Sequence, residues 1–565
     1  EYTYDSRYRL TSTVKPDQSV ARILAYDKLS RPTQVKDGNG NITHYLYNEA
    51  GQVVSTLAPD GTRSYSIYNL DGSVQKFMDG KVENDAGSNW YETSYEYDSM
   101  GRITKVDTGG SCVSTSYNYE TLTSGGTTYA DFIVTTTAAN NTELKKQRYD
   151  SRGLLIREEA NGTFVDAQYD AAGNLVKTTT EDGVVTEYAY DDYMNQIAAK
   201  LTPSSTIDPQ KPQPSVFTSK DYDYMGNVLL ARDGEGNETA YSYDALSRLT
   251  KTGQRANSGG ALIETSYQYD VISNGKVQNI TTNPRGLRSV TTFDTMGRVV
   301  SQKDVPTESA AASIESTYTY DGNGNVIQKH WKNTVKSGEN WVDEWVDNWY
   351  EYDAMNRLTK AVYKRSGSGE NAVDVAYTEY AYDARGRRTA MRDYRETRDS
   401  EGNITGTELF SEKLYVYNSQ DQVIQYVYNG TSVDASYDGA GNLIGLDYQK
   451  AETDGSDRMQ YQYVYNDENQ LSGVKLTLYD YAGVEIDKFD IAAYTYDKGR
   501  LTSQQTFRDF RENSSAYIQK TYGYNNWGLV NSISYADSAA PQTVKESYAY
   551  TYDKRGFITQ ETAVN

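Results

Sequence analysis

The sequence has few of the residues that enzymes commonly use as bases, thiol nucleophiles and metal ligands. It contains one cysteine, Cys112, and two histidines, His44 and His330, in 565 residues. A single cysteine excludes an intrachain disulfide framework and a cysteine-rich metal site. A catalytic Ser-His-Asp or Cys-His arrangement needs a base beside its nucleophile, and neither the separated histidines nor Cys112 has such a neighbour in sequence. We therefore predict a non-enzyme with no catalytic residue, cofactor or required metal.

Long apolar runs and clustered positive charge are also missing. No stretch approaches the roughly 18 to 20 apolar residues that a membrane-spanning helix needs. The formal net charge of −22 and the pI of about 4.7 oppose nucleic-acid binding, which requires clustered Lys and Arg. We expect no membrane span and no nucleic-acid partner. Because the chain opens with Glu1 inside a repeat, without Met or a signal-like segment, we also expect it to belong to a longer polypeptide.

Tyrosine is the abundant aromatic residue, with 54 copies against 10 Phe. Its ring favours strands and can be buried while its hydroxyl stays hydrogen-bonded or wet, which suits a thin sheet. An aromatic residue followed by Asp or Asn and then by a turn recurs about twenty-one times, at intervals of roughly 20 to 30 residues. These anchors are Tyr4, Tyr26, Tyr47, Tyr68, Tyr97, Tyr149, Tyr169, Tyr190, Tyr222, Tyr243, Tyr269, Phe293, Tyr320, Tyr352, Tyr382, Tyr417, Tyr437, Tyr465, Tyr496, Tyr524 and Tyr552.

Each anchor predicts a hairpin turn. Asp or Asn suits the first position of a type I turn, and a Gly three residues later can adopt positive φ and close a bulged hairpin. A second kind of turn, such as Pro59-Asp60-Gly61, marks the other end of each hairpin. The predicted structural residues include Tyr4, Asp5, Tyr47, Gly51, Tyr97, Asp98, Gly101, Tyr169, Asp170, Gly173, Tyr243, Asp244, Tyr320, Asp321, Gly324, Tyr382, Asp383, Gly386, Tyr552, Asp553 and Gly556.

The turn pattern predicts an all-β fold with almost no helix. We expect residues 1–565 to form one continuous array, a spirally wound strip of antiparallel β-hairpins resembling a barrel-like solenoid. Many anchors have a second Tyr two residues earlier, so one face of the strip should be aromatic, with anchor rings stacked as a ladder, and the other wettable. Two insertions interrupt the array: a Pro-rich loop at 201–215 and a Trp-rich elongated hairpin at 329–350.

Two local features could bind ligands. Trp341, Trp345 and Trp349 recur every four residues, so they share one side of the chain. They could form an aromatic platform for a sugar or a protein, or pack on the tyrosine ladder. The loops at 37–41, 233–237 and 321–325 resemble the first half of a calcium-binding EF-hand loop but lack Gly at the sixth and Glu at the twelfth position. Plain hairpin turns are the better interpretation of these loops.

The string Tyr-x-Tyr-Asp-x-x-Gly-Arg-Leu and its variants, at 95–103, 241–249, 318–326, 350–358 and 380–388, resembles the YD repeat of bacterial Rhs proteins. Similar repeats occur in the B and C components of insecticidal toxin complexes, in wall-associated proteins and in animal teneurins. The resemblance covers essentially the whole chain. It implies a β-strip that spirals into a hollow shell, commonly around a C-terminal toxin, in a secreted or cell-surface bacterial protein.

The sequence departs from this family pattern at one point. Family members usually carry a motif like Asp-Pro-x-Gly near the end of the repeats, whereas the one Asp-Pro here is Asp208-Pro209 in the Pro-rich insertion. About 42 strands of roughly seven residues would also enclose only a small cavity, so we expect part of a larger shell or an open spiral. The predicted function is a shell segment whose partners are the rest of its polypeptide and a C-terminal toxin. The alternative is a teneurin-like adhesion or glycan-binding scaffold at a cell surface.

Overall fold

The protein forms a single antiparallel β-sheet. The computed structural model describes residues 1–82, 89–124, 127–255, 260–305, 314–337, 340–366, 372–449, 458–480, 482–507, 516–539 and 543–564. The 44 strands of these residues belong to one sheet. Within the same residues no helix is found, and so none that could cross a membrane. The prediction of an all-β antiparallel strip is confirmed.

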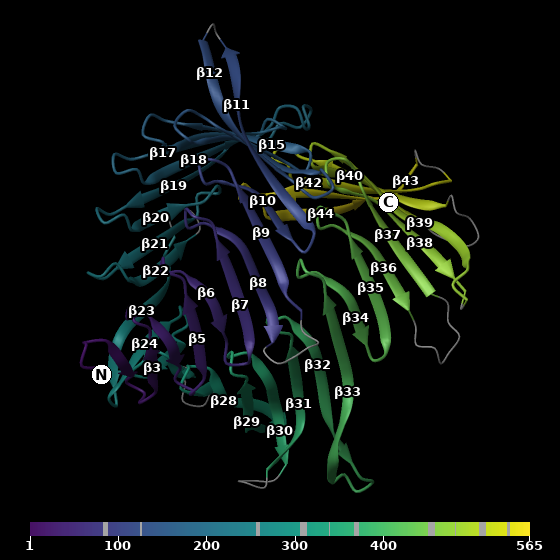
Figure 1. Ribbon diagram of the computed structural model, residues 1–565. Coiled ribbons are helices and arrows are strands. Elements are labelled where there is room, and N and C mark those ends of the chain that lie inside the picture. Colours follow the sequence, from purple (N-terminus) through teal and green to yellow (C-terminus); the bar gives the residue numbers. More distant parts are fainter. Residues whose placement is uncertain are drawn as a thin grey trace. The chain divides into compact units, whose positions relative to one another are not determined.

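The strip divides into two compact units, each made of separate stretches of chain. The first unit comprises residues 1–102, 106–110 and 265–432, and the second comprises residues 103–105, 111–264 and 433–565. Within each unit, successive strands lie side by side in chain order, as β5 to β8 show (Figure 1). The strands are β1 (Tyr2–Tyr4), β2 (Leu10–Val14), β3 (Val20–Tyr26), β4 (Pro32–Lys36), β5 (Ile42–Tyr47), β6 (Val53–Leu57), β7 (Thr62–Tyr68), β8 (Val74–Val82), β9 (Tyr91–Tyr97), β10 (Ile103–Thr108), β11 (Ser111–Ser124), β12 (Thr127–Thr137), β13 (Glu143–Tyr149), β14 (Leu155–Ala160), β15 (Thr163–Tyr169), β16 (Leu175–Thr180), β17 (Val185–Tyr190), β18 (Gln196–Thr202), β19 (Val216–Tyr222), β20 (Val228–Arg232), β21 (Glu238–Tyr243), β22 (Leu249–Arg255), β23 (Ile263–Ser273), β24 (Lys276–Thr282), β25 (Arg288–Phe293), β26 (Val299–Val305), β27 (Glu315–Tyr320), β28 (Val326–Ser337), β29 (Asn340–Tyr352), β30 (Leu358–Ser366), β31 (Val373–Tyr382), β32 (Arg388–Arg398), β33 (Ile404–Tyr417), β34 (Val423–Tyr428), β35 (Thr431–Tyr437), β36 (Leu443–Gln449), β37 (Arg458–Tyr465), β38 (Leu471–Tyr479), β39 (Glu485–Asp497), β40 (Arg500–Phe507), β41 (Tyr517–Tyr524), β42 (Val530–Asp537), β43 (Val544–Tyr552) and β44 (Ile558–Val564).

The turn after an anchor, which we call an anchor turn, has a recurring geometry. At Asp98, Oδ1 accepts the main-chain N–H groups of Met100 and Arg102 at 2.9 Å each. The main-chain N–H of Asp98 returns a bond to the carbonyl of Arg102 at 2.9 Å, and Gly101 N–H bonds to the carbonyl of Asp98 at 3.0 Å. The sheet register shifts at the anchor in the same way from repeat to repeat, as between Ser242 and Tyr243. The carboxylate thus holds a type I turn followed by a bulge.

The position three residues after the turn Asp or Asn is left-handed whether or not it holds Gly. Gly101 has a φ of 78°, while Met194, Ser247 and Asn356 occupy the same position with φ of 67°, 58° and 61°. The neighbouring hydrogen bonds hold these side-chain-bearing residues in a conformation that Gly adopts more readily. This explains why the sequence pattern is relaxed at this position.

Two anchors do not precede this turn. β23 continues past Tyr269 and turns at Asn274-Gly275, and β39 continues past Tyr496 and turns at Lys498-Gly499. Both turns place two consecutive residues at positive φ, as a tight two-residue hairpin requires. The expectation of one turn type after every anchor was therefore wrong at these two repeats.

The anchor tyrosines connect repeats through their hydroxyl groups rather than through stacked rings. Tyr243 donates to the carbonyl of Val228 at 3.0 Å, and Tyr97 donates to that of Val74 at 2.7 Å. The regular pairing of β20 with β21 ends at Leu230↔Ala240, and Val228 lies beyond it. The tyrosine hydroxyl therefore donates to the Val228 carbonyl in place of a main-chain N–H group of β21. Successive anchors lie two strands, or about 9.6 Å, apart. This spacing is too wide for the predicted ring stacking, but a tyrosine can span one strand.

At several anchor turns, an arginine joins the turn to the next repeat. Arg31 Nε bonds to Asp27 Oδ2 at 2.6 Å, and its guanidinium lies 4.7 Å from the ring centroid of the following anchor, Tyr47. Arg9 and Arg298 make the same pair of contacts, with rings at 4.4 and 4.7 Å. The consensus Tyr-Asp-x-x-Gly-Arg therefore encodes both a turn and the link between neighbouring repeats.

Where an anchor turn starts with Asn, the side-chain polarity is reversed. Asn48 Nδ2 donates to Gln52 Oε1 at 2.8 Å, and Asn418 Nδ2 donates to Gln422 Oε1 at 2.7 Å. The Oδ1 atom still accepts the main-chain N–H of the same residue, at 2.9 Å in Gln52 and 3.0 Å in Gln422. One turn can thus be closed in alternative ways: Asp at its first position pairs with Arg or Asn four residues later, and Asn pairs with Gln.

Among the residues that the structure describes, fully buried apolar side chains are few. The main cluster joins Leu476 and Leu478 of β38 to Phe489 of β39, and Val362 and Val375 are buried in the first unit. Most strand residues are only partly covered, as expected for a sheet one layer thick. Stability must therefore come largely from repeated turn and ladder contacts.

Removal of one anchor hydroxyl tests this link. We expect Tyr243→Phe to lower the free energy of unfolding by about 1 kcal/mol, because the carbonyl of Val228 loses its donor. Tyr243→Ala should cost more, up to about 3 kcal/mol, since the half-buried ring is lost as well. Chemical denaturation followed by circular dichroism measures both. The control Tyr193→Phe alters a side chain that is 81% exposed and should leave the transition unchanged.

The turn aspartates predict acid sensitivity. The backbone N–H of the arginine four residues later is the main group that lowers the pKa of Asp5, Asp27, Asp98 and Asp244. Because the pKa is lower in the folded state, the unfolded chain takes up protons first as the pH falls. Stability should be constant above about pH 5 and fall below about pH 4. Since backbone N–H groups dominate, the decline should persist at high salt; a midpoint of denaturation that stays flat to about pH 3 would contradict this.

Candidate functional site

Turns from distant stretches of chain meet edge to edge within each unit. We call the turns at the opposite edge from the anchor turns return turns, and the line where the two meet a seam. In the first unit, the return turn at 37–41 meets the anchor turn at 321–325, and both have the sequence Asp-Gly-Asn-Gly-Asn. Asn39 Nδ2 donates to Asp321 Oδ2 at 2.8 Å, and Asn323 Nδ2 donates to Asp37 Oδ2 at 2.7 Å. The two loops thus bind each other reciprocally.

Glycine permits this close contact. A Cβ atom on Gly38 would overlap the carbonyl of Gly322, and one on Gly322 would overlap the carbonyl of Gly38. Neither glycine has positive φ, so packing rather than backbone conformation excludes a side chain at these positions.

These contacts also account for the loops that resemble calcium sites. Burial alone would raise the pKa of Asp37, but hydrogen bonds from Asn323 and Asn41 outweigh it and hold the pKa below its ordinary value. Asp321 behaves likewise, with Asn325 and Asn39 as donors. The carboxylate oxygens therefore accept hydrogen bonds from amide groups. Across the described residues, no group of three His, Cys, Asp or Glu is arranged to hold a metal ion.

Ion pairs extend the seam of the first unit in both directions. Arg298 reaches Asp17 at 3.0 Å, Arg357 reaches Asp60 at 3.2 Å, and Arg385 reaches Asp79 at 3.2 Å. In sequence, the hydrogen-bonded partners lie between 282 and 312 residues apart. Asp17 and Asp60 lie in return turns and Asp79 lies in β8, so each pair joins a later anchor turn to an earlier stretch of the strip.

The second unit repeats this arrangement. Gln470 Nε2 donates to the carbonyl of Asn161 at 2.9 Å, Arg500 binds Asp182 at 2.7 Å, and Lys554 N–H donates to Glu235 Oε1 at 2.6 Å. These partners are 309 to 319 residues apart. A seam between later anchor turns and earlier return turns is therefore a property of both units.

The Pro-rich insertion belongs to the seam of the second unit. Residues 203–215 connect β18 to β19, and Asn526 of an anchor turn is almost fully buried against them. Its Nδ2 donates to the carbonyls of Asp208 and Lys211 at 2.7 and 3.1 Å, while its Oδ1 accepts Asp208 N–H at 2.6 Å. Trp527 Nε1 donates to the carbonyl of Pro214 at 3.1 Å. The extended loop thus supplies main-chain groups where the other repeats supply a short turn.

The Trp-rich segment forms the hairpin β28–β29. Trp345 is 49% exposed, and the His330 ring stacks on it with centroids 4.5 Å apart and planes inclined by 7°. Trp349 is half-buried, with the Arg365 guanidinium 4.1 Å from its ring. The side chain of Trp341 lies outside the described residues. Of the predicted aromatic platform, the structure therefore exposes one ring, Trp345, backed by an imidazole.

The three residues considered for catalysis lie in ordinary strands. His44 is exposed on β5 and Cys112 is half-buried on β11. His330 Nδ1 lies 2.9 Å from Asp347 Oδ1 across the β28–β29 pair, and Trp345 covers one face of its ring. The contacts of His330 are those of a packed cross-strand pair.

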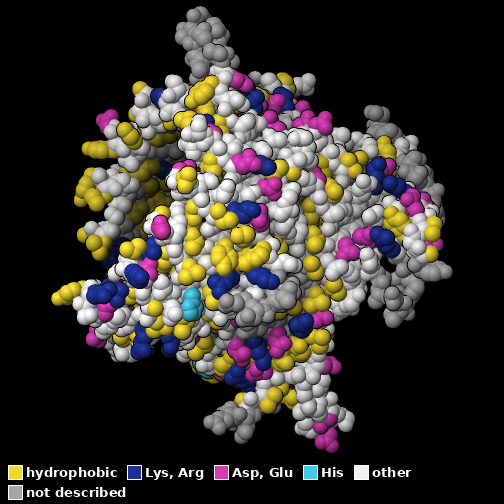
Figure 2. All heavy atoms as spheres, viewed as in Figure 1, with side chains coloured by type: hydrophobic (Ala, Val, Ile, Leu, Met, Phe, Trp, Pro, Cys, Tyr) yellow, Lys and Arg dark blue, Asp and Glu magenta, His cyan; other side chains and the backbone are white. Residues whose placement is uncertain are grey.

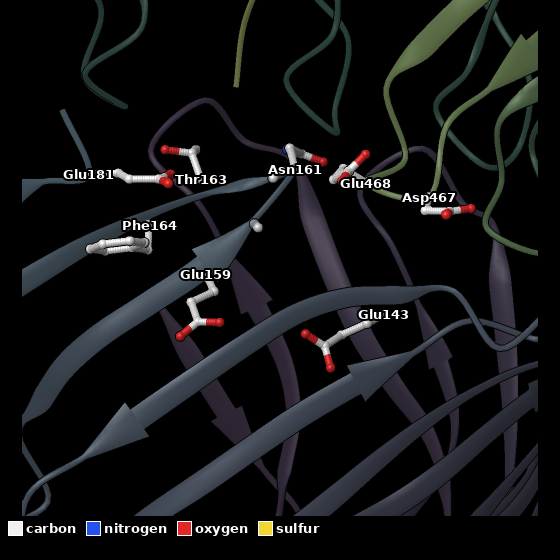
Figure 3. Close-up of a pocket in the computed structure, with 10 residues that line it drawn as sticks. Glu143, Glu159, Asn161, Thr163, Phe164, Glu181, Asp467 and Glu468 are labelled. Atoms are coloured by element: carbon white, nitrogen blue, oxygen red, sulfur yellow. The ribbon is translucent and has the colours of Figure 1, made fainter. Parts of the chain in front are cut away.

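An acidic pocket of about 290 Å³ lies along the seam of the second unit. Figure 3 shows Glu143 and Glu159 on neighbouring strands, with Asp467 and Glu468 on the facing anchor turn. Glu181 completes the acidic lining, which contains no Lys or Arg. The pocket would favour a cation electrostatically, but its carboxylates do not form a metal-binding group within the described residues.

Sequence analysis did not identify the seams. The signal available was the identical pentapeptide at 37–41 and 321–325, but identity alone does not predict contact. It also missed Tyr117, whose hydroxyl donates to the carbonyl of Ile103 at 2.9 Å although no turn follows it. Tyr117 lies within the long strand β11, so it keeps the anchor's hydrogen bond without the anchor's turn.

Family models match several parts of the chain. Residues 212–402 match the model described as Teneurin YD-shell, and residues 26–63, 149–184 and 169–206 match the one described as RHS Repeat. The tRNA3(Ser)-specific nuclease WapA of Bacillus spizizenii is 26% identical over 257 residues, covering 45% of this chain and 10% of that protein. Teneurin-4 of Homo sapiens is 22% identical over 284 residues, covering 48% of this chain and 9% of that protein. The chain thus spans about a tenth of the length of these relatives.

Solved structures share the fold. The crystal structure of TcdB2-TccC3 matches 98% of this chain and 33% of its own, with a TM-score of 0.50 and 13% identity. A structure of the Photorhabdus luminescens Tc holotoxin pore that carries a TccC3 mutation matches 98% of this chain and 34% of its own, with a TM-score of 0.50 and 12% identity. The repeated Tyr-Asp turns, the antiparallel strip and these matches place the chain in the YD-repeat (Rhs-repeat) family.

Proposed function

We propose that the chain is a segment of a β-shell that encloses or displays a C-terminal toxin or effector of its own polypeptide. Its part in this is structural rather than catalytic. The observation that carries the proposal is the seam: later anchor turns bind earlier return turns by hydrogen bonds and ion pairs in both units. A strip that joins its own edges in this way makes a continuous wall.

The chemistry of the strip supports a wall rather than an active centre. Asp98 and Arg102 hold a turn, and Tyr97 links that turn to the preceding repeat. A secreted or cell-surface bacterial protein is the setting that we propose, since a toxin enclosed by such a wall would be kept from the producing cell until release. The partners would be the remainder of the polypeptide and its toxin domain.

Opening the seam in the full-length polypeptide tests enclosure. We expect Gly38→Ala combined with Asp60→Asn to accelerate proteolysis of the segment that follows the repeats at least several-fold, because two neighbouring seam contacts are lost. Asn at position 60 keeps an oxygen for the turn bond from Thr62 N–H but removes the charge that binds Arg357. Immunoblotting of the C-terminal segment during limited digestion measures the rate.

The matched control is Gly406→Ala. A Cβ atom at Gly406 would meet Thr397 Oγ1 at 3.5 Å, an ordinary contact, so digestion should match the parent. Circular dichroism should show the sheet intact in every variant. Equally rapid digestion of the C-terminal segment in the parent and the seam variant, with the repeats still folded, would contradict enclosure.

A second candidate function is favoured by the β28–β29 hairpin. We propose that the exposed Trp345 ring, held by stacking on His330, would serve an adhesion or glycan-binding scaffold as a contact for a sugar face. Such a role requires an accessible ring and a rigid support, and both are present at this position.

Glycan-array binding tests the second candidate. We expect Trp345→Ala to abolish any glycan signal of the intact protein, whereas Val342→Ala, at an exposed position of the same strand, should retain it. Equal signals from the two variants, or no signal from the parent, would leave the shell function alone.

A further inference from the structure

The anchor turns of residues 1–102 form an exposed row in the first unit. Tyr8, Leu29 and Met100 are 91%, 68% and 73% exposed, and Leu70 is fully exposed. These large apolar side chains lie in the anchor turns, where the turn hydrogen bonds are made by the main chain and the Asp or Asn. We call this set the free anchor row.

The equivalent turns of residues 265–432 are more covered, although Met355, at the position of Leu29 in its own turn, is 40% exposed. The position that Leu29 and Met100 occupy in their turns is held here by Met296, Asn323 and Arg385. All three of these residues are half-buried and so less exposed than Leu29 and Met100. Each of their turns binds an earlier stretch of chain: the partners are Asp17 and Asp37 of return turns and Asp79 of β8. Two rows of the same construction therefore differ in whether an acidic return edge lies against them.

We propose that the free anchor row is the docking surface for a further winding of the same kind of strip, carried upstream of Glu1 in the same polypeptide. In the seam bonds of the first unit, an anchor turn binds a residue of a return turn, or Asp79 of β8, that lies 281 to 312 residues earlier. Applied to Leu29 or Leu70, this rule places the partner before Glu1. The inference concerns the wall alone and holds whether or not a toxin is enclosed.

The charge of the row fits an acidic return edge. Arg298 and Arg357 bind their own turn aspartates and also Asp17 and Asp60 of the facing turn. Arg9, Arg31 and Arg102 follow their own turn aspartates in the same way, with ion pairs of 2.6 to 2.7 Å. The guanidinium groups of these residues thus lie at the same place in the turn as those of Arg298 and Arg357. The upstream return turns should accordingly carry Asp.

A second copy of this chain fits the row less well. The return turns that dock in the first unit follow short strands such as β2, β4 and β6, each of five residues. The return edge of residues 265–432 instead carries long hairpins, including β28–β29 with 12 and 13 residues and β32–β33 with 11 and 14. Such hairpins would hold two copies apart where the seam requires turns in contact.

The second unit has a row of the same kind. Tyr193, Tyr224, Met225 and Leu246 are all exposed at anchor turns. Figure 2 shows hydrophobic side chains at successive tips on the left, in the region where Figure 1 places β17 to β22. The long β11–β12 hairpin extends from the anchor-turn edge of this unit, so the test is made in the first unit.

Cysteine labelling tests the proposal. In a Cys112→Ser background, Leu70→Cys is introduced both into the 565-residue chain and into the full-length polypeptide, and the rate of maleimide labelling is measured. We expect labelling to be at least about tenfold slower in the full-length polypeptide, because the upstream winding covers the site. Met100→Cys is a second probe of the same row. Leu409→Cys, at an exposed position on β33, should label equally in both chains.

Each result decides for or against the proposal. Protection of both row positions in the full-length polypeptide, with Leu409→Cys unprotected, supports it. Equal labelling in the two chains overturns it, as does a full-length polypeptide without an upstream strip. Protection that appears in the 565-residue chain as its concentration is raised would identify a second copy as the occupant and overturn it too. None of these results depends on toxin protection, so failure here is distinguishable from failure of the proposed shell function.

Discussion

The hydrogen bond from each anchor tyrosine to the main chain of the preceding repeat is the interaction on which the strip depends. The bulge that follows an anchor ends the regular ladder early and leaves a carbonyl such as that of Val228 without a main-chain donor. A partly buried carbonyl without a donor lowers stability, and the Tyr243 hydroxyl supplies the donor. The next arginine then lies over the ring and binds the turn aspartate, as Arg31 does with Tyr47 and Asp27. Many copies of this set of tyrosine, arginine and aspartate contacts stabilise a thin sheet that has little buried core.

The local half of the architecture could be predicted from sequence. Asp98 and Gly101 specify their turn through hydrogen bonds within five residues, and such short-range chemistry is visible in the chain itself. The anchors at Tyr269 and Tyr496 were misjudged because a two-residue turn slightly downstream competes with the expected one. The predicted stacking of anchor rings on one another was also wrong, because another strand lies between the two strands that carry successive anchors.

The seams could not be predicted, because they join residues roughly 300 positions apart through the accumulated twist of the strip. The meeting of Gly38 with Gly322 follows from the placement of many intervening strands, not from any local signal. The same holds for Trp345: the sequence placed three tryptophans on one side, but only the register of β28 with β29 brings His330 under the ring. The proposed shell function therefore rests on non-local contacts, while the sequence signature of the repeats is local.

The proposed wall depends on the edges of the strip. Acidic return turns and basic anchor turns are complementary, so one strip can extend a wall by repeating a single kind of contact. A density map of the full-length polypeptide tests this account most directly. The account predicts windings joined by anchor-to-return seams around a lumen that holds a poorly ordered polypeptide. A spiral whose interior is filled by its own side chains, with no lumen, would contradict it.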